Sequence, residues 1–195
     1  MTTKNVAAPS LKQKLQFINE GGAVVRFHAR TGIKLETDAH HSLNVVLLCY
    51  LLTGGSASTN LLMAAATHDL AEQAAGDVPA PAKWAGGFGR ALDDYEHSFL
   101  ERFKLVFKIE PEDNFVLNMA DAMAGMLYCC REAALGNRSA RLIYEKWRVH
   151  LLKLQSTNKN EALKAIPVNS LLEAIHEIWE ESNDTQGSQF DVYAS

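Results

Sequence analysis

The feature that most constrains the fold is the spacing of the apolar residues. They recur at intervals of three and four residues in at least six segments, which is the period of a helix with one buried face. No segment alternates apolar and polar residues as a half-buried strand would. The sequence therefore predicts an all-α protein of about six to seven helices. We expect one compact domain over residues 1–182 and a polar, frayed tail over residues 183–195.

Glycine and proline residues mark the ends of the expected helices. These helices cover residues 10–20, 40–52, 60–75, 89–108, 114–135, 139–154 and 169–181. Paired glycines follow the first two helices, and glycine readily takes the left-handed backbone conformation that ends a helix. Prolines at positions 79 and 81 predict a loop over residues 77–87, because proline lacks the amide donor. The polar segment 25–39 is predicted to be a connection.

Charge and cysteine content limit the class of protein. The 195 residues carry 19 basic and 23 acidic side chains, for a formal net charge of −4. This balance argues against binding to a nucleic acid polymer or an anionic membrane through an overall positive field. The three cysteines lack the spacing of a disulfide framework, which fits a reducing compartment. No apolar stretch is long enough to span a bilayer, and the amino terminus lacks a signal-peptide core, so we expect a cytoplasmic protein.

Titratable residues interrupt two stretches that are otherwise suited only to a core. His68, Asp69 and Glu72 lie in an alanine-rich stretch, and Asp121 lies in a second apolar one. An ionised carboxylate that is buried without a partner costs several kcal/mol, so these groups need compensation. A divalent cation held by His68, Asp69, Asp121 and one of two adjacent histidines at positions 40 and 41 would supply it. A hydrogen-bonded polar network in a structural helical bundle is the alternative.

Four motifs follow one another in the order found in a known family. They are Arg26-Phe27-His28, an acidic-His-Ser motif ending in His41-Ser42, His68-Asp69-Leu70-Ala71-Glu72, and a loop from Gly76-Asp77 to Lys83-Trp84. Together with Asp121 they resemble the H…HD…D signature of the HD-domain metal-dependent phosphohydrolases. Within that family the chain resembles the YfbR-type 5′-deoxynucleotidases and the DatZ-type dATP triphosphohydrolases of bacteriophages. The similarity covers about residues 24–136 and implies a compact helical HD-domain fold.

Two positions depart from the pattern of this family. His40 stands where the family usually has a glutamate before the metal-binding histidine. We assign the ligand to His41, because it directly precedes Ser42 as in the motif. Phe27 stands where tryptophan is common in the nucleotidases, so no base preference is carried over through this position. The predicted metal ligands are His41, His68, Asp69 and Asp121.

The resemblance implies hydrolysis of the 5′ phosphoester of a 2′-deoxynucleotide, with metal-activated water attacking the α-phosphorus. A monophosphate would give a deoxynucleoside and phosphate, and a triphosphate such as dATP would give a deoxynucleoside and triphosphate. The sequence does not choose between these substrates. We expect cobalt, manganese or zinc as the ion, with magnesium as a candidate second ion. The resemblance also implies a homo-oligomer in a bacterial cell or a phage-infected host.

The motif positions imply further roles. Glu72 would orient the attacking water or take its proton, and Asp77 would protonate the leaving 5′ oxygen. A loop-capping carboxylate is the alternative for Asp77. The predicted substrate-binding residues are Arg26, Phe27, His28, Lys83 and Trp84. The two cations would bind phosphate oxygens and the aromatic rings would stack on the base, with ordinary surface and core positions as the alternatives.

A second hypothesis for the whole chain is a catalytically silent HD module that binds a nucleotide or a partner and regulates another process. Such a module has no need of a buried set of residues that activates water, so the presence of Glu72 beside all four ligand types favours the enzyme.

Overall fold

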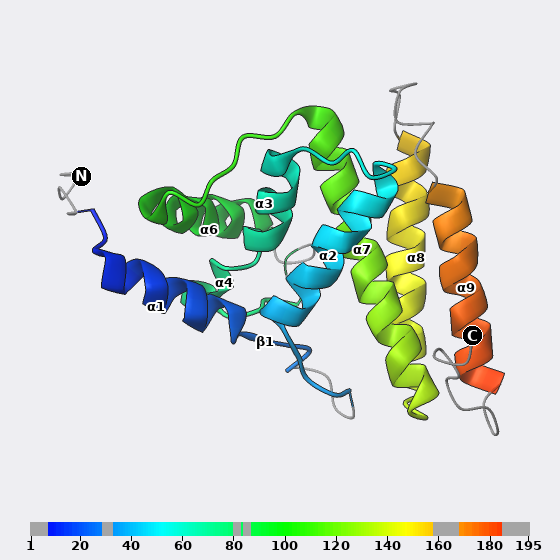
Figure 1. Ribbon diagram of the computed structural model, residues 1–195. Helices are drawn as coiled ribbons and strands as arrows, with labels where there is room; N and C mark the ends of the chain where they lie inside the picture. The colour runs from blue at the N-terminus through cyan, green and yellow to red at the C-terminus, as the bar shows by residue number, and fades with distance from the viewer. Residues whose placement is uncertain (1–7, 29–32, 80–82, 84–86, 158–167, 185–195) are drawn as a thin grey trace, which may run out of the picture. The chain divides into compact units, whose positions relative to one another are not determined.

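The computed structural model describes residues 8–28, 33–79, 83, 87–157 and 168–184, and these are predominantly helical (Figure 1). The elements in chain order are α1 (Leu11–Gly22), β1 (Val25–Arg26), β2 (Glu36–Thr37), α2 (Asp38–Leu52), α3 (Thr59–Thr67), α4 (Glu72–Ala75), α6 (Gly89–Phe103), α7 (Pro111–Ala134), α8 (Ala140–Thr157) and α9 (Val168–Asp184). The predicted all-α class is confirmed. Residues 185–195, most of the predicted tail, lie outside the described residues.

The chain divides into two compact units, Met1–Asp121 and Ala122–Ser195, here called unit 1 and unit 2. Helix α7 begins in unit 1 and ends in unit 2. The single domain expected over residues 1–182 stays a prediction. Among the described helices, none combines the length and the apolar composition needed to cross a membrane.

Helix α1 is fixed at both ends within unit 1. It begins after Ser10, whose side chain accepts a hydrogen bond from the amide of Gln13 in a capping box. Its Phe17 ring stacks on Phe103 of α6, with the ring centroids 4.0 Å apart. Near its end the helix approaches Leu70 so closely that a Cβ at Gly21 would lie 2.8 Å from the Leu70 carbonyl oxygen. A glycine is therefore required where α1 crosses the segment between α3 and α4.

The connection over residues 25–39 contains a small sheet that the sequence did not predict. Strands β1 and β2 pair antiparallel, with Val25 opposite Thr37 and Arg26 opposite Glu36. Each strand has two residues, which is too short for an alternating pattern to show. The pairing places a cation directly across from a carboxylate, and it brings Arg26 to the entrance of α2.

The predicted helix over residues 60–75 is wrong as one element. Helix α3 ends at Thr67, and four residues of turn separate it from the short α4. The amides of Leu70 and Glu72 bond to carbonyls three residues earlier, as in tighter turns. The ring of His68 takes the Ala65 carbonyl, which is the acceptor that the next amide would use in a continuing helix. The break therefore starts at a residue of the candidate site.

The end of α6 and the start of α7 also differ from the predictions. Helix α6 ends at Phe103 instead of residue 108, because Lys104 takes a left-handed conformation and the amide of Leu105 bonds to the Leu100 carbonyl. This closure uses a lysine where glycine is usual, so the sequence carries no signal for it. Helix α7 starts at Pro111, three residues before the prediction, since proline is favoured at a first helical position.

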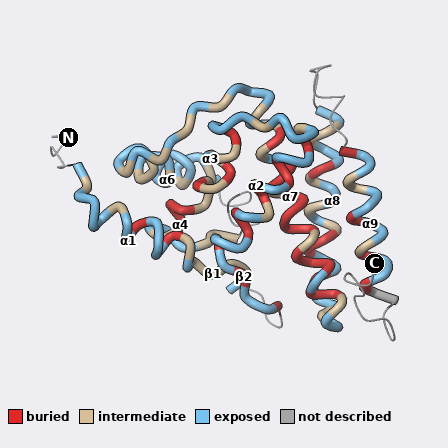
Figure 2. Tube along the Cα trace, in the orientation of Figure 1, coloured by how far each residue is buried: buried red, intermediate tan, exposed pale blue. Residues whose placement is uncertain are grey.

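Unit 2 has its own packed interior, visible as the buried residues of its helices in Figure 2. Tyr144 of α8 stacks on Trp179 of α9 with the ring centroids 4.2 Å apart. Trp147 of α8 lies against Gly125 of α7, where a Cβ would approach the indole nitrogen to 2.8 Å. These aromatic contacts bury large areas and hold the three helices of this unit together.

Candidate metal centre

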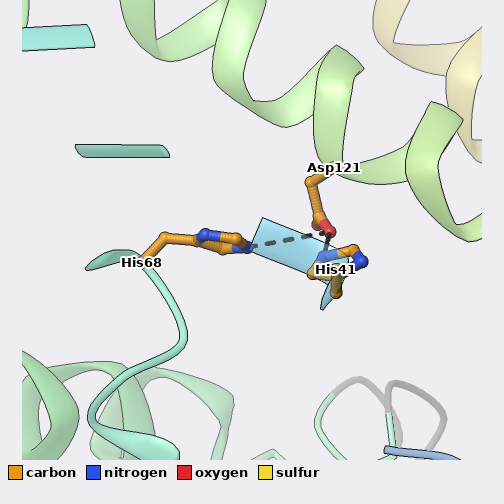
Figure 3. A group of neighbouring side chains, drawn as sticks. All are labelled: His41, His68 and Asp121. Atoms are coloured by element: carbon orange, nitrogen blue, oxygen red, sulfur yellow. Dashed lines mark hydrogen bonds and ion pairs between the residues drawn. The ribbon is translucent and has the colours of Figure 1, made fainter. Parts of the chain in front are cut away.

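His41 and Asp121 meet across unit 1. His41 lies in the first turns of α2 and is 1% exposed, and Asp121 lies on α7. The Nε2 atom of His41 is 2.9 Å from Oδ1 of Asp121, a hydrogen-bond distance between residues 80 positions apart (Figure 3). The other nitrogen of His41, Nδ1, lies 3.8 Å from Oε2 of Glu36. At this distance Glu36 places a negative charge behind the ring without forming a hydrogen bond to it.

His68 approaches the same point from the turn after α3. Its Nδ1 lies 2.8 Å from the Ala65 carbonyl oxygen. A carbonyl only accepts hydrogen bonds, so Nδ1 carries the proton and Nε2 is the nitrogen that presents a lone pair when the ring is neutral. Nε2 is buried and has no well-aligned hydrogen-bond partner among the described residues. It lies 4.0 Å from Oδ1 of Asp121, and Figure 3 shows it directed there.

Asp69 completes this group of side chains. Its Oδ2 lies 3.2 Å from Nε2 of His68 and 3.7 Å from Nε2 of His41. Burial by itself would raise the pKa of Asp69, but His68 and Arg26 hold it well below its usual range. For His68 burial would lower the pKa, and Asp69 and Asp121 instead raise it to about 9. The two shifts describe an ion pair between these side chains, and His68 must lose its proton before its Nε2 can bind a metal ion.

These four side chains fit a divalent ion. Donor atoms of His41, His68 and Asp121 lie within 4.8 Å of one another. The four distances from the Nε2 atoms of the two histidines to the carboxylate oxygens of Asp69 and Asp121 run from 2.9 to 4.0 Å. Two ligands on one tetrahedral ion, with bonds of about 2.0 Å, lie about 3.3 Å apart. Two imidazole nitrogens and carboxylate oxygens are suitable ligands for zinc, cobalt or manganese.

The two adjacent histidines, His40 and His41, have different surroundings in the structure. His40 has a side chain that is 45% exposed, and its Nδ1 lies 2.8 Å from Oε1 of Glu36. His41 points inward to Asp121. One carboxylate, Glu36, therefore contacts both rings on the side away from the candidate ion. Sequence reasoning did not single out Glu36, because this residue precedes the helix and no local pattern marks its contacts with the two rings.

Asp38 is a second acidic residue to which the sequence analysis gave no role. It is the first residue of α2, it is 1% exposed, and both its carboxylate oxygens are buried without a hydrogen-bond partner among the described residues. Burial and the nearby Asp69 raise its pKa to about 7, against the opposing effect of Arg26. Asp38, Asp69 and Glu72 form a second group whose donor oxygens lie within 4.8 Å of one another.

Arg26, predicted to bind phosphate, lies among these carboxylates. Its Nη1 donates to Oδ2 of Asp69 and lies 3.6 Å from Oδ1 of Asp38. Its Nε lies 3.8 Å from Oε2 of Glu36. Burial alone would lower the pKa of this guanidinium, but Asp69 and Asp121 raise it further above its ordinary value. The side chain is 12% exposed, so the cation belongs to the interior of the site.

Glu72 lies at the buried side of the site, beside Lys83. It is 3% exposed, and Nζ of Lys83 lies 3.4 Å from its Oε1. Burial and the charge of Asp69 raise the pKa of Glu72 to about 9, and Arg26 opposes this shift. At this pKa the carboxyl group is mostly protonated at neutral pH, so a cation bound beside it is needed before it can take a proton from water. Glu72 and His68 do not share a helix face, because α3 ends before both.

Asp77 and the Arg26-Phe27-His28 segment are in contact. Oδ2 of Asp77 accepts a hydrogen bond of 3.1 Å from the backbone amide of Phe27 and lies 3.9 Å from Nδ1 of His28. The His28 side chain is 51% exposed. Trp84, the other predicted base-stacking residue, lies outside the described residues. The structure thus joins two of the predicted motifs through a single carboxylate.

Comparison with known proteins identifies no family for the chain. No protein-family model matches it, and no curated protein sequence matches it. The resemblance to the HD-domain phosphohydrolases therefore remains a prediction from the motifs of this sequence.

Proposed function

We propose that this chain is a divalent-metal-dependent phosphohydrolase of the HD-domain type, which cleaves the 5′ phosphoester of 2′-deoxynucleotides. One observation carries the proposal. His41, His68 and Asp121 come from distant parts of the sequence and direct their donor atoms to one point, where Nε2 of His68 has no well-aligned partner among the described residues. A structural core normally satisfies such a buried nitrogen.

His41, His68, Asp69 and Asp121 would hold the ion. Once bound, it supplies Lewis-acid polarisation of a phosphate oxygen and lowers the pKa of a water molecule. Asp69 accepts a hydrogen bond from Arg26, and the carboxylate of Glu36 lies 3.8 Å behind the His41 ring, so two of the ligands have a charged group behind them. Such contacts orient ligands and retain metal affinity.

Glu72 is the proposed proton acceptor for the attacking water. Its carboxylate lies within 4.8 Å of the Asp69 donor atom, and the charge of an ion bound there would lower the pKa of Glu72 so that it can accept a proton. Lys83 holds one of its oxygens at 3.4 Å and leaves the other without a hydrogen-bond partner among the described residues. A fixed carboxylate with one open oxygen is suited to orient a water and take its proton.

Arg26 and Lys83 supply the positive charge for the phosphate, and Asp77 is the proposed proton donor to the leaving 5′ oxygen. An arginine offers several donors, so Arg26 can contact Asp69 and a phosphate at once. Both cations lie next to the ligand cluster, through Asp69 and Glu72 respectively. This arrangement supports a phosphoester substrate over a neutral one.

The test begins with the ion and continues with the products. The purified chain is expected to carry one divalent ion, measured by elemental analysis. Supplied with cobalt, manganese or zinc, it is then assayed with dAMP, dATP, AMP and ATP, and the products are separated by ion-exchange chromatography. Release of deoxyadenosine with phosphate or with triphosphate supports the proposal and identifies the substrate class. A bound ion with nucleotide binding but no product would instead indicate a regulatory module, and no ion would indicate a structural bundle.

A further inference from the structure

Two groups of donor atoms adjoin each other in unit 1. The first consists of His41, His68 and Asp121, and the second consists of Asp38, Asp69 and Glu72. Asp69 connects them, because its Oδ2 lies 3.2 Å from Nε2 of His68. The nitrogen-rich group suits zinc or cobalt, whereas three carboxylates suit a hard ion such as magnesium or manganese. By ligand chemistry alone, the protein offers places for two ions.

The second group already contains a cation from the chain itself. Nη1 of Arg26 donates to Asp69 and lies 3.6 Å from Oδ1 of Asp38. A guanidinium is not deprotonated in proteins, so its positive charge is permanent. Lys83 contributes a further cation at Glu72, 3.4 Å from Oε1. Arg26 and Lys83 therefore already supply part of the positive charge that a second ion would bring.

We propose that the guanidinium of Arg26 takes the place of a second divalent cation, so that the free protein binds one ion per chain, and that removing this guanidinium creates a second site for a hard divalent ion. The new site would use Asp38, Asp69 and Glu72. This inference rests on the proposed function only in requiring that the first ion binds at His41, His68 and Asp121.

The burial of Asp38 supports this assignment in addition to the proximity of the three carboxylates. The residue is 1% exposed, and both oxygens lack a hydrogen-bond partner among the described residues. Among the described residues, the cationic atom nearest its carboxylate is Nη1 of Arg26, 3.6 Å from Oδ1. A buried carboxylate needs a partner or a bound cation to offset its desolvation. With Arg26 truncated, Asp38 loses that cation, and an ion from solution is the replacement that restores the charge balance.

The experiment counts manganese ions on the whole chain. Equilibrium dialysis with elemental analysis is carried out on the wild type, Arg26→Ala, Arg26→Gln and Arg26→Lys, after circular dichroism has verified folding. We expect one ion for the wild type and for Arg26→Lys, which keeps a cation. Two ions are expected for Arg26→Ala and Arg26→Gln, with the spin coupling between neighbouring manganese ions visible in the electron paramagnetic resonance spectrum. Adding Asp38→Asn to either variant should return the count to one.

The possible outcomes separate this inference from the proposed function. Two ions on the wild type, or one ion on a folded Arg26→Ala or Arg26→Gln variant, would overturn the role given to Arg26 while leaving the first centre in place. No ion on the wild type would contradict the metal centre and, with it, both proposals. A wild-type count of two overturns the inference without any variant, and two truncations of Arg26 are used so that unfolding of one of them does not remove the test.

Discussion

The backbone amide of Phe27 donates a hydrogen bond to Oδ2 of Asp77 across 3.1 Å, and Phe27 itself has a φ of 60°. A positive φ is unfavourable for a non-glycine residue, at a cost of about 1 kcal/mol. Asp77 therefore holds a strained turn, and this turn sets the place of Arg26 one residue earlier. The carboxylate combines this positioning contact with the proton-donor role proposed for it.

Substitutions at Asp77 separate these two roles. Asparagine keeps an oxygen that accepts from Phe27 but carries no transferable proton. We expect Asp77→Asn to keep KM within about threefold and to lower kcat by about 10²-fold. Asp77→Ala also releases the turn, and loss of a hydrogen bond to a charged group is worth about a further tenfold in KM. Steady-state kinetics on the accepted deoxynucleotide measure both values, and equal KM values in the two variants would contradict the positioning role.

The adjacent histidines of α2 give a matched pair of substitutions. His41→Ala removes a nitrogen that lies 2.9 Å from Asp121, whereas His40→Ala removes a ring that is 45% exposed. We expect the first variant to lose stoichiometric metal and the second to retain it, by elemental analysis after dialysis. Loss of a ligand from a four-ligand site weakens binding by orders of magnitude, whereas loss of a ring outside the ligand set leaves the site complete. Equal metal contents would mean that the ligand has been assigned to the wrong histidine.

Glu72 is expected to matter for turnover and not for metal retention. Glu72→Gln keeps the shape of the side chain and removes its ability to take a proton, so kcat should fall by about 10²-fold or more. Metal content should stay at the wild-type value. Asp69→Ala is the contrasting change, because Asp69 lies 3.2 Å from Nε2 of His68 and should be needed for both metal and turnover. Full activity of Glu72→Gln would place the proton acceptor elsewhere.

The sequence predicted helices and ligand candidates because both leave strong local signals. Apolar residues at helical spacing located α1, α2, α8 and α9 to within a few residues of their observed limits. Titratable groups in apolar surroundings pointed to His68, Asp69 and Asp121, and the structure brings these side chains together. A buried charge is rare enough that its position alone carries information.

Other features depended on tertiary contacts that no local pattern records. Glu36 and Asp38 look like ordinary acidic residues at the start of a helix, and only the fold turns them toward His41 and Arg26. The end of α3 comes from a ring that competes for a backbone carbonyl, and neither glycine nor proline marks it. The two-residue strands are stabilised through the pairing of Arg26 with Glu36, which lie far apart along the connection.

The close approach of α1 to the segment carrying Asp69 leads to another prediction. A Cβ at Gly21 would lie 2.8 Å from the Leu70 carbonyl oxygen, whereas a Cβ at Gly22 would meet only the Cβ of Ala39, at 3.3 Å. Gly21→Ala should lower the free energy of unfolding by about 1–3 kcal/mol and weaken metal binding, because Leu70 adjoins a ligand. Gly22→Ala should be close to neutral, since alanine also favours the helix. Urea denaturation and metal titration of both variants test this, and equal stability would contradict it.

The buried thiol of Cys130 in unit 2 gives a pH dependence of stability. Burial raises the pKa of Cys130 from 9.0 to about 12 in the folded protein. Between these values the unfolded chain has lost the proton that the folded chain still holds, so stability falls as pH rises through this range. The slope from one such group is at most about 1.4 kcal/mol per pH unit.

Urea denaturation at a pH of about 8, 9.5 and 10.5 measures this slope, because these values lie below and above the ordinary pKa of the thiol, 9.0. We expect a smaller fall for Cys130→Ala than for the wild type, because other groups also titrate there and only the difference belongs to this thiol. Identical slopes would show that the thiol ionises equally in both states.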